Sequence, residues 1–122
     1  MRSSLLVAAL LVVTRVHSAS AEDQQREYTV YGYGLESCSF WVEHRKQKNL
    51  FRAAAQEWVS GFVSGIGAVG YFDLAKTNND AMYAFIDKYC EENPSATLVH
   101  AANELGLSLA SDALKEETAV GR

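Results

Sequence analysis

The sequence lacks the short motifs that mark the commonest catalytic and phosphate-binding sites. No GxxxxGK[ST] phosphate loop, no HExxH zinc motif and no GxSxG nucleophile motif occurs among its 122 residues. No segment shows the sustained alternation of apolar and polar residues that is typical of a half-buried strand. We therefore expect no active site, no cofactor and no sheet, and the chain is predicted not to be an enzyme.

Metal ligands and thiols are equally scarce. Two of the three histidines, His44 and His100, fall on different predicted helices, and the two cysteines, Cys38 and Cys90, form no CxxC pair. In an exported protein two cysteines pair by default, so a disulfide is favoured over a metal site or a catalytic thiol. A disulfide between Cys38 and Cys90 would close a long loop, and the chain-entropy estimate for a loop of that length is a stabilisation of about 4 kcal/mol at most.

The first 21 residues have the features of a cleavable export signal. Arg2 gives a positive start, residues 5–13 are apolar without interruption, and residues 19–21 (Ala-Ser-Ala) are small enough for cleavage. Cleavage is predicted after Ala21, with Ala19 as the alternative, and a retained N-terminal helix or anchor is the competing interpretation. No apolar run approaches the roughly 20 residues that span a bilayer, so no membrane span is expected after cleavage.

The predicted mature chain, residues 22–122, is acidic. Loss of Arg2 and Arg15 leaves nine basic residues against all 15 acidic ones, a formal charge of −6. A negative net charge argues against binding to nucleic acid or to an anionic membrane surface. It is compatible with a basic protein partner, and more simply with a soluble acidic domain that has no such partner.

Apolar residues recur at helical spacing in four segments, which predict helices over about 35–46, 50–69, 80–91 and 95–114. An irregular arm over 22–34 and a frayed tail over 115–122 complete the expected order. Capping residues support the first three helix starts, at Ser37, at Asn49, and at Asn78 or Asn79. The predicted fold class is therefore all-α, with one helical domain over 35–114.

The second and third predicted helices carry the clearest apolar faces. On the second, the residues predicted to be buried are Phe51, Ala54, Ala55, Trp58, Phe62 and Ile66. On the third, they are Met82, Phe85, Ile86, Tyr89 and Cys90. This spacing places Cys90 on a buried face, where it can meet Cys38 at the start of the first helix.

Three polar or small residues on these helices need a physical reason. Gly61 and Gly65 each cost about 1 kcal/mol in a helix interior. Close packing of another helix against them is the predicted reason, and a ligand pressed against the bare backbone is the alternative. Asp87 lies at the boundary of an apolar face, and it is predicted either to bond a neighbouring helix end or to belong to a binding surface.

Three segments of the chain resemble the Rap/Tai-type immunity proteins. They are Cys38 with Trp41 three positions on, W-V-S-G-F-V-S-G at 58–65, and D-K-Y-C-E-E-N-P at 87–94 followed by an Ala/Leu-rich helix. The likeness covers about residues 35–110. Members of that family are small periplasmic helical proteins that neutralise peptidoglycan amidases delivered by type VI secretion. The resemblance implies a compact bundle of four to five helices held by a Cys38–Cys90 disulfide, a periplasmic location and an inhibitory role.

The family provides no short inhibitory motif that can be transferred residue by residue. The loop from Tyr71 to Asn79 is the predicted partner-binding surface, because it joins two core helices and begins with Tyr71, Phe72 and Asp73. Capping of the bundle by the two rings is the alternative. The expected partner is a protein, most specifically a peptidoglycan amidase effector, and the resemblance is also compatible with a homodimer.

The residues also fit a second function class. Envelope chaperones that respond to acid are likewise small, helical and held by one disulfide. Below about pH 3.5, protonation of the carboxylates would take the charge from −6 toward +11, so that self-repulsion opens the bundle and exposes its apolar faces. The alternatives to an amidase inhibitor are thus an acid-responsive holding chaperone and a family member with another binding role in the envelope.

Overall fold

The computed structural model describes residues 28–74 and 76–121. The predicted export signal and residues 22–27 of the predicted arm lie outside this part of the chain. Within it, a short 3-10 helix precedes four α-helices: η1 (Gly32–Leu35), α1 (Cys38–Arg45), α2 (Leu50–Gly70), α3 (Asn79–Glu92) and α4 (Leu98–Val120). The predicted all-α fold class is confirmed.

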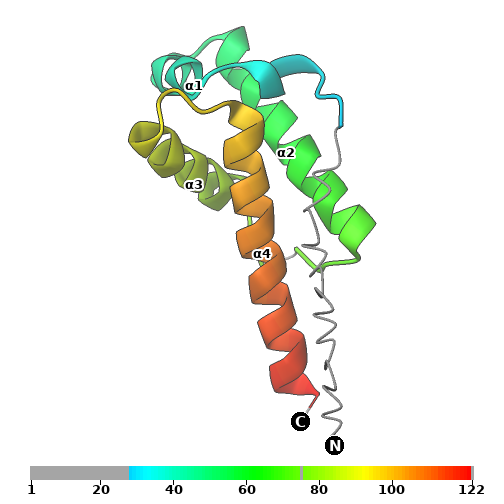
Figure 1. Ribbon diagram of the computed structural model, residues 1–122. Helices are drawn as coiled ribbons and strands as arrows, with labels where there is room; N and C mark the ends of the chain where they lie inside the picture. The colour runs from blue at the N-terminus through cyan, green and yellow to red at the C-terminus, as the bar shows by residue number, and fades with distance from the viewer. Residues whose placement is uncertain (1–27, 75, 122) are drawn as a thin grey trace, which may run out of the picture.

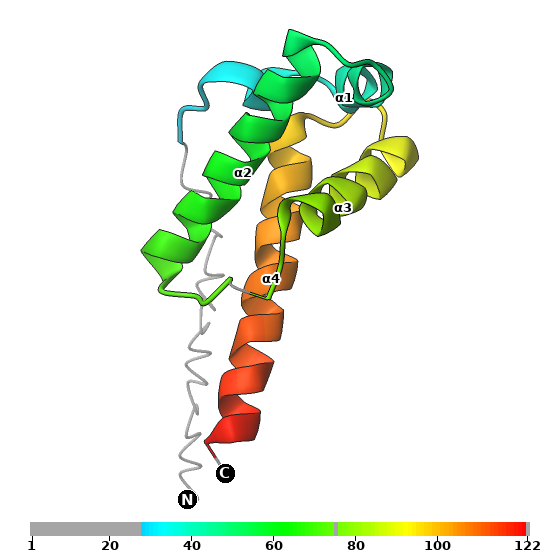
Figure 2. The ribbon, with the colours of Figure 1, turned by 180° about the vertical axis from the view of Figure 1, so that it is seen from behind.

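The helices form an elongated molecule with two different ends. η1 and α1 lie across the end at which α2 and α4 begin, and α3 runs back toward this end (Figure 1). At the opposite end, α2 stops at Tyr71, while α4 continues past the other helices, as the reverse view also shows (Figure 2). We call the two ends the α1 end and the Tyr71 end.

Side-chain caps begin three of the helices where the sequence predicts them. In each, the side-chain oxygen accepts a hydrogen bond of 2.9–3.1 Å from the backbone N–H three residues on, and the capping residues are Ser37, Asn49 and Asn78. Such a bond satisfies one of the backbone donors that a helix start leaves unpaired. These local signals act within a few residues, which is why they are readable without the tertiary structure.

The fourth helix begins later than predicted, at Leu98 rather than Ser95. The residues before it instead pair with the chain that leads into α1. The backbone N–H of Cys38 donates to the Ala96 carbonyl over 2.8 Å, and the N–H of Leu98 donates to the Glu36 carbonyl over 2.8 Å. Residues 93–96 form a turn closed by the hydrogen bond from the Ala96 N–H to the Asn93 carbonyl, and Thr97 is extended in a bridge with Ser37, so the helix begins only at Leu98.

The fourth helix also ends later than predicted, at Val120 rather than Leu114. The prediction of a frayed tail over 115–122 is therefore wrong as far as residue 120. The physical reason is local: Ala, Leu, Lys and Glu fill positions 113–117, and no glycine or proline lies between Gly106 and Gly121.

The core lies where the four helices meet near the α1 end. Its largest fully buried side chains are Trp41, Ile86, Leu98, Val59, Val63, Cys38 and Cys90. On α3 the predicted face is confirmed for Met82, Ile86 and Cys90, while Phe85 and Tyr89 are half-buried against the core and Tyr83 is buried in addition.

On α2 the predicted face is confirmed for Ala55, and for the other predicted residues it is wrong in its rotation about the helix axis. The residues that are buried are Ala55, Val59, Val63 and Gly67. Phe51 is exposed, and Ala54, Trp58, Phe62 and Ile66 are half-buried. Because α2 carries apolar residues almost all round, spacing alone cannot select which of them face the core.

The predicted helix packing at Gly61 and Gly65 is also wrong within this chain. Both glycines are exposed, and a Cβ built at either would meet no atom of residues 28–74 and 76–121 within 4 Å. Their side of α2 faces away from the other helices. Close approach occurs instead at Gly34, where a Cβ would overlap the Trp58 ring.

Because of these two environments, replacing glycine by alanine is expected to change the free energy of unfolding in opposite directions at Gly61 and at Gly34. Gly61→Ala is expected to raise the free energy of unfolding by about 0.5–1 kcal/mol, because alanine is the better helix former and meets open space. Gly34→Ala is expected to lower it by about 1–3 kcal/mol, because the Trp58 ring must move. Urea unfolding of the two variants measures both; a loss of stability in Gly61→Ala would show that this face of α2 is covered.

Candidate functional site

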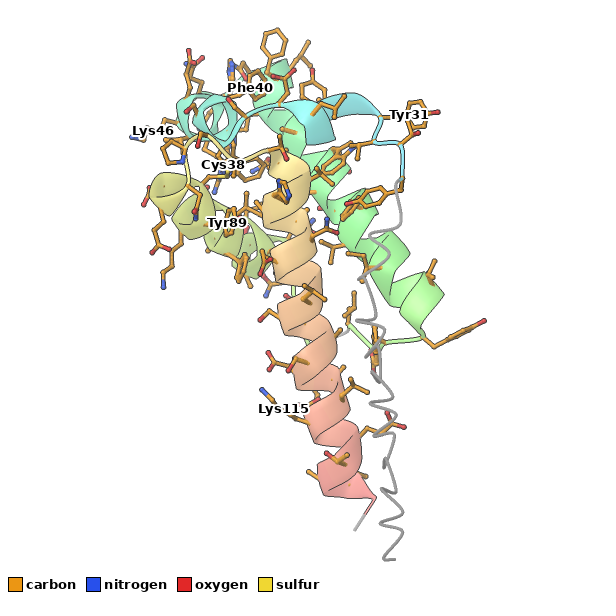
Figure 3. All side chains as sticks on the ribbon, in the orientation of Figure 1. Tyr31, Cys38, Phe40, Lys46, Tyr89 and Lys115 are labelled. Atoms are coloured by element: carbon orange, nitrogen blue, oxygen red, sulfur yellow. A yellow bond between two sulfur atoms is a disulfide. The ribbon has the colours of Figure 1, made fainter. Side chains whose placement is uncertain are left out.

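The Cys38–Cys90 disulfide ties the start of α1 to the end of α3. The two Cα atoms are 4.7 Å apart, and both residues are completely buried. Cys38 lies inside the α1 end, between α1, α3 and the beginning of α4 (Figure 3). The predicted pairing is confirmed, and its burial assigns it a structural role.

Asp87 provides a second link between the same two helices. Its Oδ1 accepts hydrogen bonds from Trp41 Nε1 over 2.7 Å and from Arg45 Nε over 2.8 Å, and its Oδ2 accepts one from Arg45 Nη2 over 2.9 Å. The guanidinium lies 5.5 Å from the centre of the Trp41 ring and 5.8 Å from that of Tyr83. The first of the two predictions for Asp87, a bond to a neighbouring helix end, is confirmed.

Arg45 is a residue that the sequence reasoning did not single out. Nothing within its own helix marks it, because its role depends on a carboxylate 42 positions further along the chain. The two hydrogen bonds to Asp87 form a bidentate pair, which is the strongest arrangement for these groups. The Trp41–Arg45–Asp87 network is thus part of the scaffold.

Exposed apolar side chains at the α1 end are in part explained within the chain. They are Tyr31, Leu35, Leu50 and Phe51. The Phe51 ring centre lies 6.3 Å from that of Phe40 and 5.2 Å from that of His44, so these rings pack on one another. Figure 3 shows Phe40 and Tyr31 at this end of the molecule, far from α4's last turns.

Tyr71 presents a different case at the opposite end. It is the C-cap of α2, directly after Gly70, and its backbone is left-handed, with φ 57° and ψ 35°. Glycine is the usual residue in this position, and another residue there costs about 1 kcal/mol or more. The side chain is 95% exposed, so burial of the ring does not offset this cost.

Phe72 and Asp73 follow Tyr71 but lie differently. Phe72 is half-buried, and its ring packs on Gly70, where an added Cβ would overlap it. For Phe72 the alternative prediction, capping of the bundle, is therefore supported, whereas the Tyr71 ring points into solvent. Asp73 is exposed and lines one hollow with both aromatic residues, so the structure brings the three predicted residues together.

The described residues contain no other arrangement that suggests chemistry. In that part of the chain, no group of three or more His, Cys, Asp or Glu residues is placed to hold a metal ion. Nor does any helix there have both the length and the apolar character needed to cross a bilayer. The candidate site is therefore a surface, centred on Tyr71.

The segments that resemble the Rap/Tai-type proteins all belong to the scaffold. Cys38 and Trp41 begin α1, residues 58–65 form the middle of α2, and residues 87–94 end α3 and lead toward α4. Their contacts explain the fold rather than an activity. Comparisons of the chain with protein-family models, with curated proteins and with solved structures found no match. The resemblance stays a prediction.

Proposed function

We propose that this chain is an exported protein-binding module that blocks its partner with the Tyr71 end, in its most specific form a periplasmic inhibitor of a peptidoglycan amidase. The observation that carries the proposal is Tyr71 itself. An aromatic side chain stands where glycine would be the more stable residue, and its ring is almost entirely in solvent. Strain that no burial of the ring among the described residues offsets points to a contact with a partner.

The geometry around Tyr71 suits insertion into a cleft. The residue sits at the end of a 21-residue helix, and the backbone N–H groups of Tyr71 and Phe72 both donate to the Gly67 carbonyl. The ring is therefore presented on a fixed backbone. A tyrosine that becomes buried in a partner contributes much binding energy for little loss of side-chain freedom.

Two further points support an amidase of the cell wall as the partner. The Rap/Tai resemblance implies that target class, and a disulfide persists in oxidising compartments such as the periplasm. The acidic charge of the predicted mature chain favours a partner with a basic surface. Inhibition then requires no chemistry from this chain, because filling the cleft excludes the substrate.

The test is binding to a peptidoglycan amidase, sought first among the genes beside this one, measured by calorimetry with oxidised protein. We expect Tyr71→Gly to weaken the complex roughly 30-fold, the effect of losing a binding hot spot of about 2 kcal/mol. The same variant is expected to be more stable by about 0.5–1 kcal/mol, because the left-handed position then holds glycine. Tyr31→Ala is the matched control, since Tyr31 is 79% exposed at the other end.

Loss of affinity together with a gain in stability cannot come from misfolding, so this pair of results is diagnostic. An unchanged affinity in Tyr71→Gly would refute the role of the Tyr71 end. Absence of any complex with the amidase would refute the target class. If the chain instead forms a Tyr71-dependent complex with a different envelope protein, the binding role of the Tyr71 end is supported and the amidase is not its target.

A further inference from the structure

The second half of α4 has little to pack against in the part of the chain that the structure describes. From Leu107 to Val120 the helix runs for about four turns. None of these residues is buried, and only Leu109, Ala110 and Ala113 are half-buried. A helical stretch of this length is marginal in water when it has no partner. Figures 1 and 2 show it extending beyond the rest of the bundle.

A groove lies between this part of α4 and the loop that follows α2. It consists of two adjoining hollows, of about 600 Å³ and about 410 Å³, that share Lys76, Ala113 and Glu116. Its apolar residues come from both walls and are Phe72, Leu74, Leu109, Ala113 and Val120. We call it the loop–α4 groove, and Tyr71 stands at its margin.

The charges that line the groove are mainly negative. Its four carboxylates are Asp73, Asp112, Glu116 and Glu117. Two lysines face them: Lys76 pairs with Glu116, and Lys115 pairs with Asp112 over 3.5 Å. Four carboxylates against two lysines give the lining residues a formal charge of −2, and the rest of the lining is largely apolar. Figure 3 shows Lys115 on the protruding half of α4.

We infer that the loop–α4 groove binds a cationic amphipathic segment of the partner protein. The inference rests on the proposed function, because it extends the Tyr71 contact along the same end of the molecule. A groove lined by both apolar and acidic residues matches a segment that carries apolar residues on one side and Lys or Arg beside them. A second copy of this chain would bring the same negative groove, and nucleic acid would bring phosphates, so like-charge repulsion disfavours both.

The test uses a helical Leu/Lys peptide as the probe and its Leu/Glu twin as the control, titrated by calorimetry at low ionic strength. The Lys peptide is expected to bind and the Glu twin is not. Glu117→Lys is expected to weaken binding about tenfold, because it reverses a charge in the groove. Glu104→Lys changes the overall charge equally but lies on α4 outside the groove, so it is expected to weaken binding less than about twofold.

Three outcomes would overturn this inference. Equal weakening in the two variants would mean that overall charge, not the groove, attracts the peptide. Equal binding of the Glu twin would remove the charge argument. If sedimentation shows that the protein self-associates and that Glu117→Lys abolishes this, the groove binds a second copy of the chain instead. The peptide titration needs no amidase, so its result and the fate of the proposed target are independent.

Discussion

Replacing Cys38 and Cys90 together by alanine is expected to lower the free energy of unfolding by about 4 kcal/mol. The bond joins residues 52 positions apart, so without it the unfolded chain regains the freedom of a long loop. α1 has eight residues and is too short to persist alone, and its position depends on this bond and on the backbone pairing with residues 94–97. For a domain of this size, the melting temperature should fall by roughly 15–30 °C.

The measurement is urea and thermal unfolding of the oxidised protein and of the double variant. A reductant serves as the control: it should destabilise the parent protein and leave the double variant unchanged. Because both sulfur atoms are buried, reduction should be slow under native conditions and should speed up with urea. A double variant that unfolds within about 1 kcal/mol of the parent would contradict the structural role of the bond.

Asp87→Ala is expected to lower the free energy of unfolding by about 3 kcal/mol. The substitution removes three hydrogen bonds at once and leaves the Trp41 indole N–H and the Arg45 guanidinium without their acceptor. Trp41 is almost completely buried, so water cannot readily replace the lost acceptor. Tryptophan fluorescence during urea unfolding should report the change directly.

Two further variants sharpen this prediction. Asp87→Asn keeps an oxygen for the indole but loses the charge that pairs with Arg45, so a smaller loss of about 1–2 kcal/mol is expected. Asp80→Ala makes the same substitution at an exposed position in the first turn of α3, where only about 0.5 kcal/mol is expected. Equal losses at Asp80 and Asp87 would show that the network contributes nothing specific.

The candidate site was only partly predictable. The loop that begins with Tyr71 could be located, because it lies between two periodic segments and carries two adjacent aromatic residues. Which ring would be free could not be derived. Phe72 folds back because Gly70 leaves room for it, whereas the left-handed backbone of Tyr71 directs its ring into solvent. The loop–α4 groove had no sequence signal, since the far end of α4 was expected to be frayed.

Several features of this protein follow from the sequence by itself. The helix starts at Ser37, Asn49 and Asn78, the all-α class and the pairing of two cysteines depend on interactions within a few residues or on simple counting. Interactions within a few residues do not depend on where the segment lies in the molecule.

Only the tertiary structure decided which face of α2 is buried, why Gly61 meets open space while Gly34 meets Trp58, and that Arg45 and Asp87 share hydrogen bonds. It also decided that α4 and the loop after α2 form two walls of one groove. The physical reason is that packing and pairing join residues tens of positions apart, and a helix that is apolar on most sides acquires its orientation only from the neighbours that it contacts.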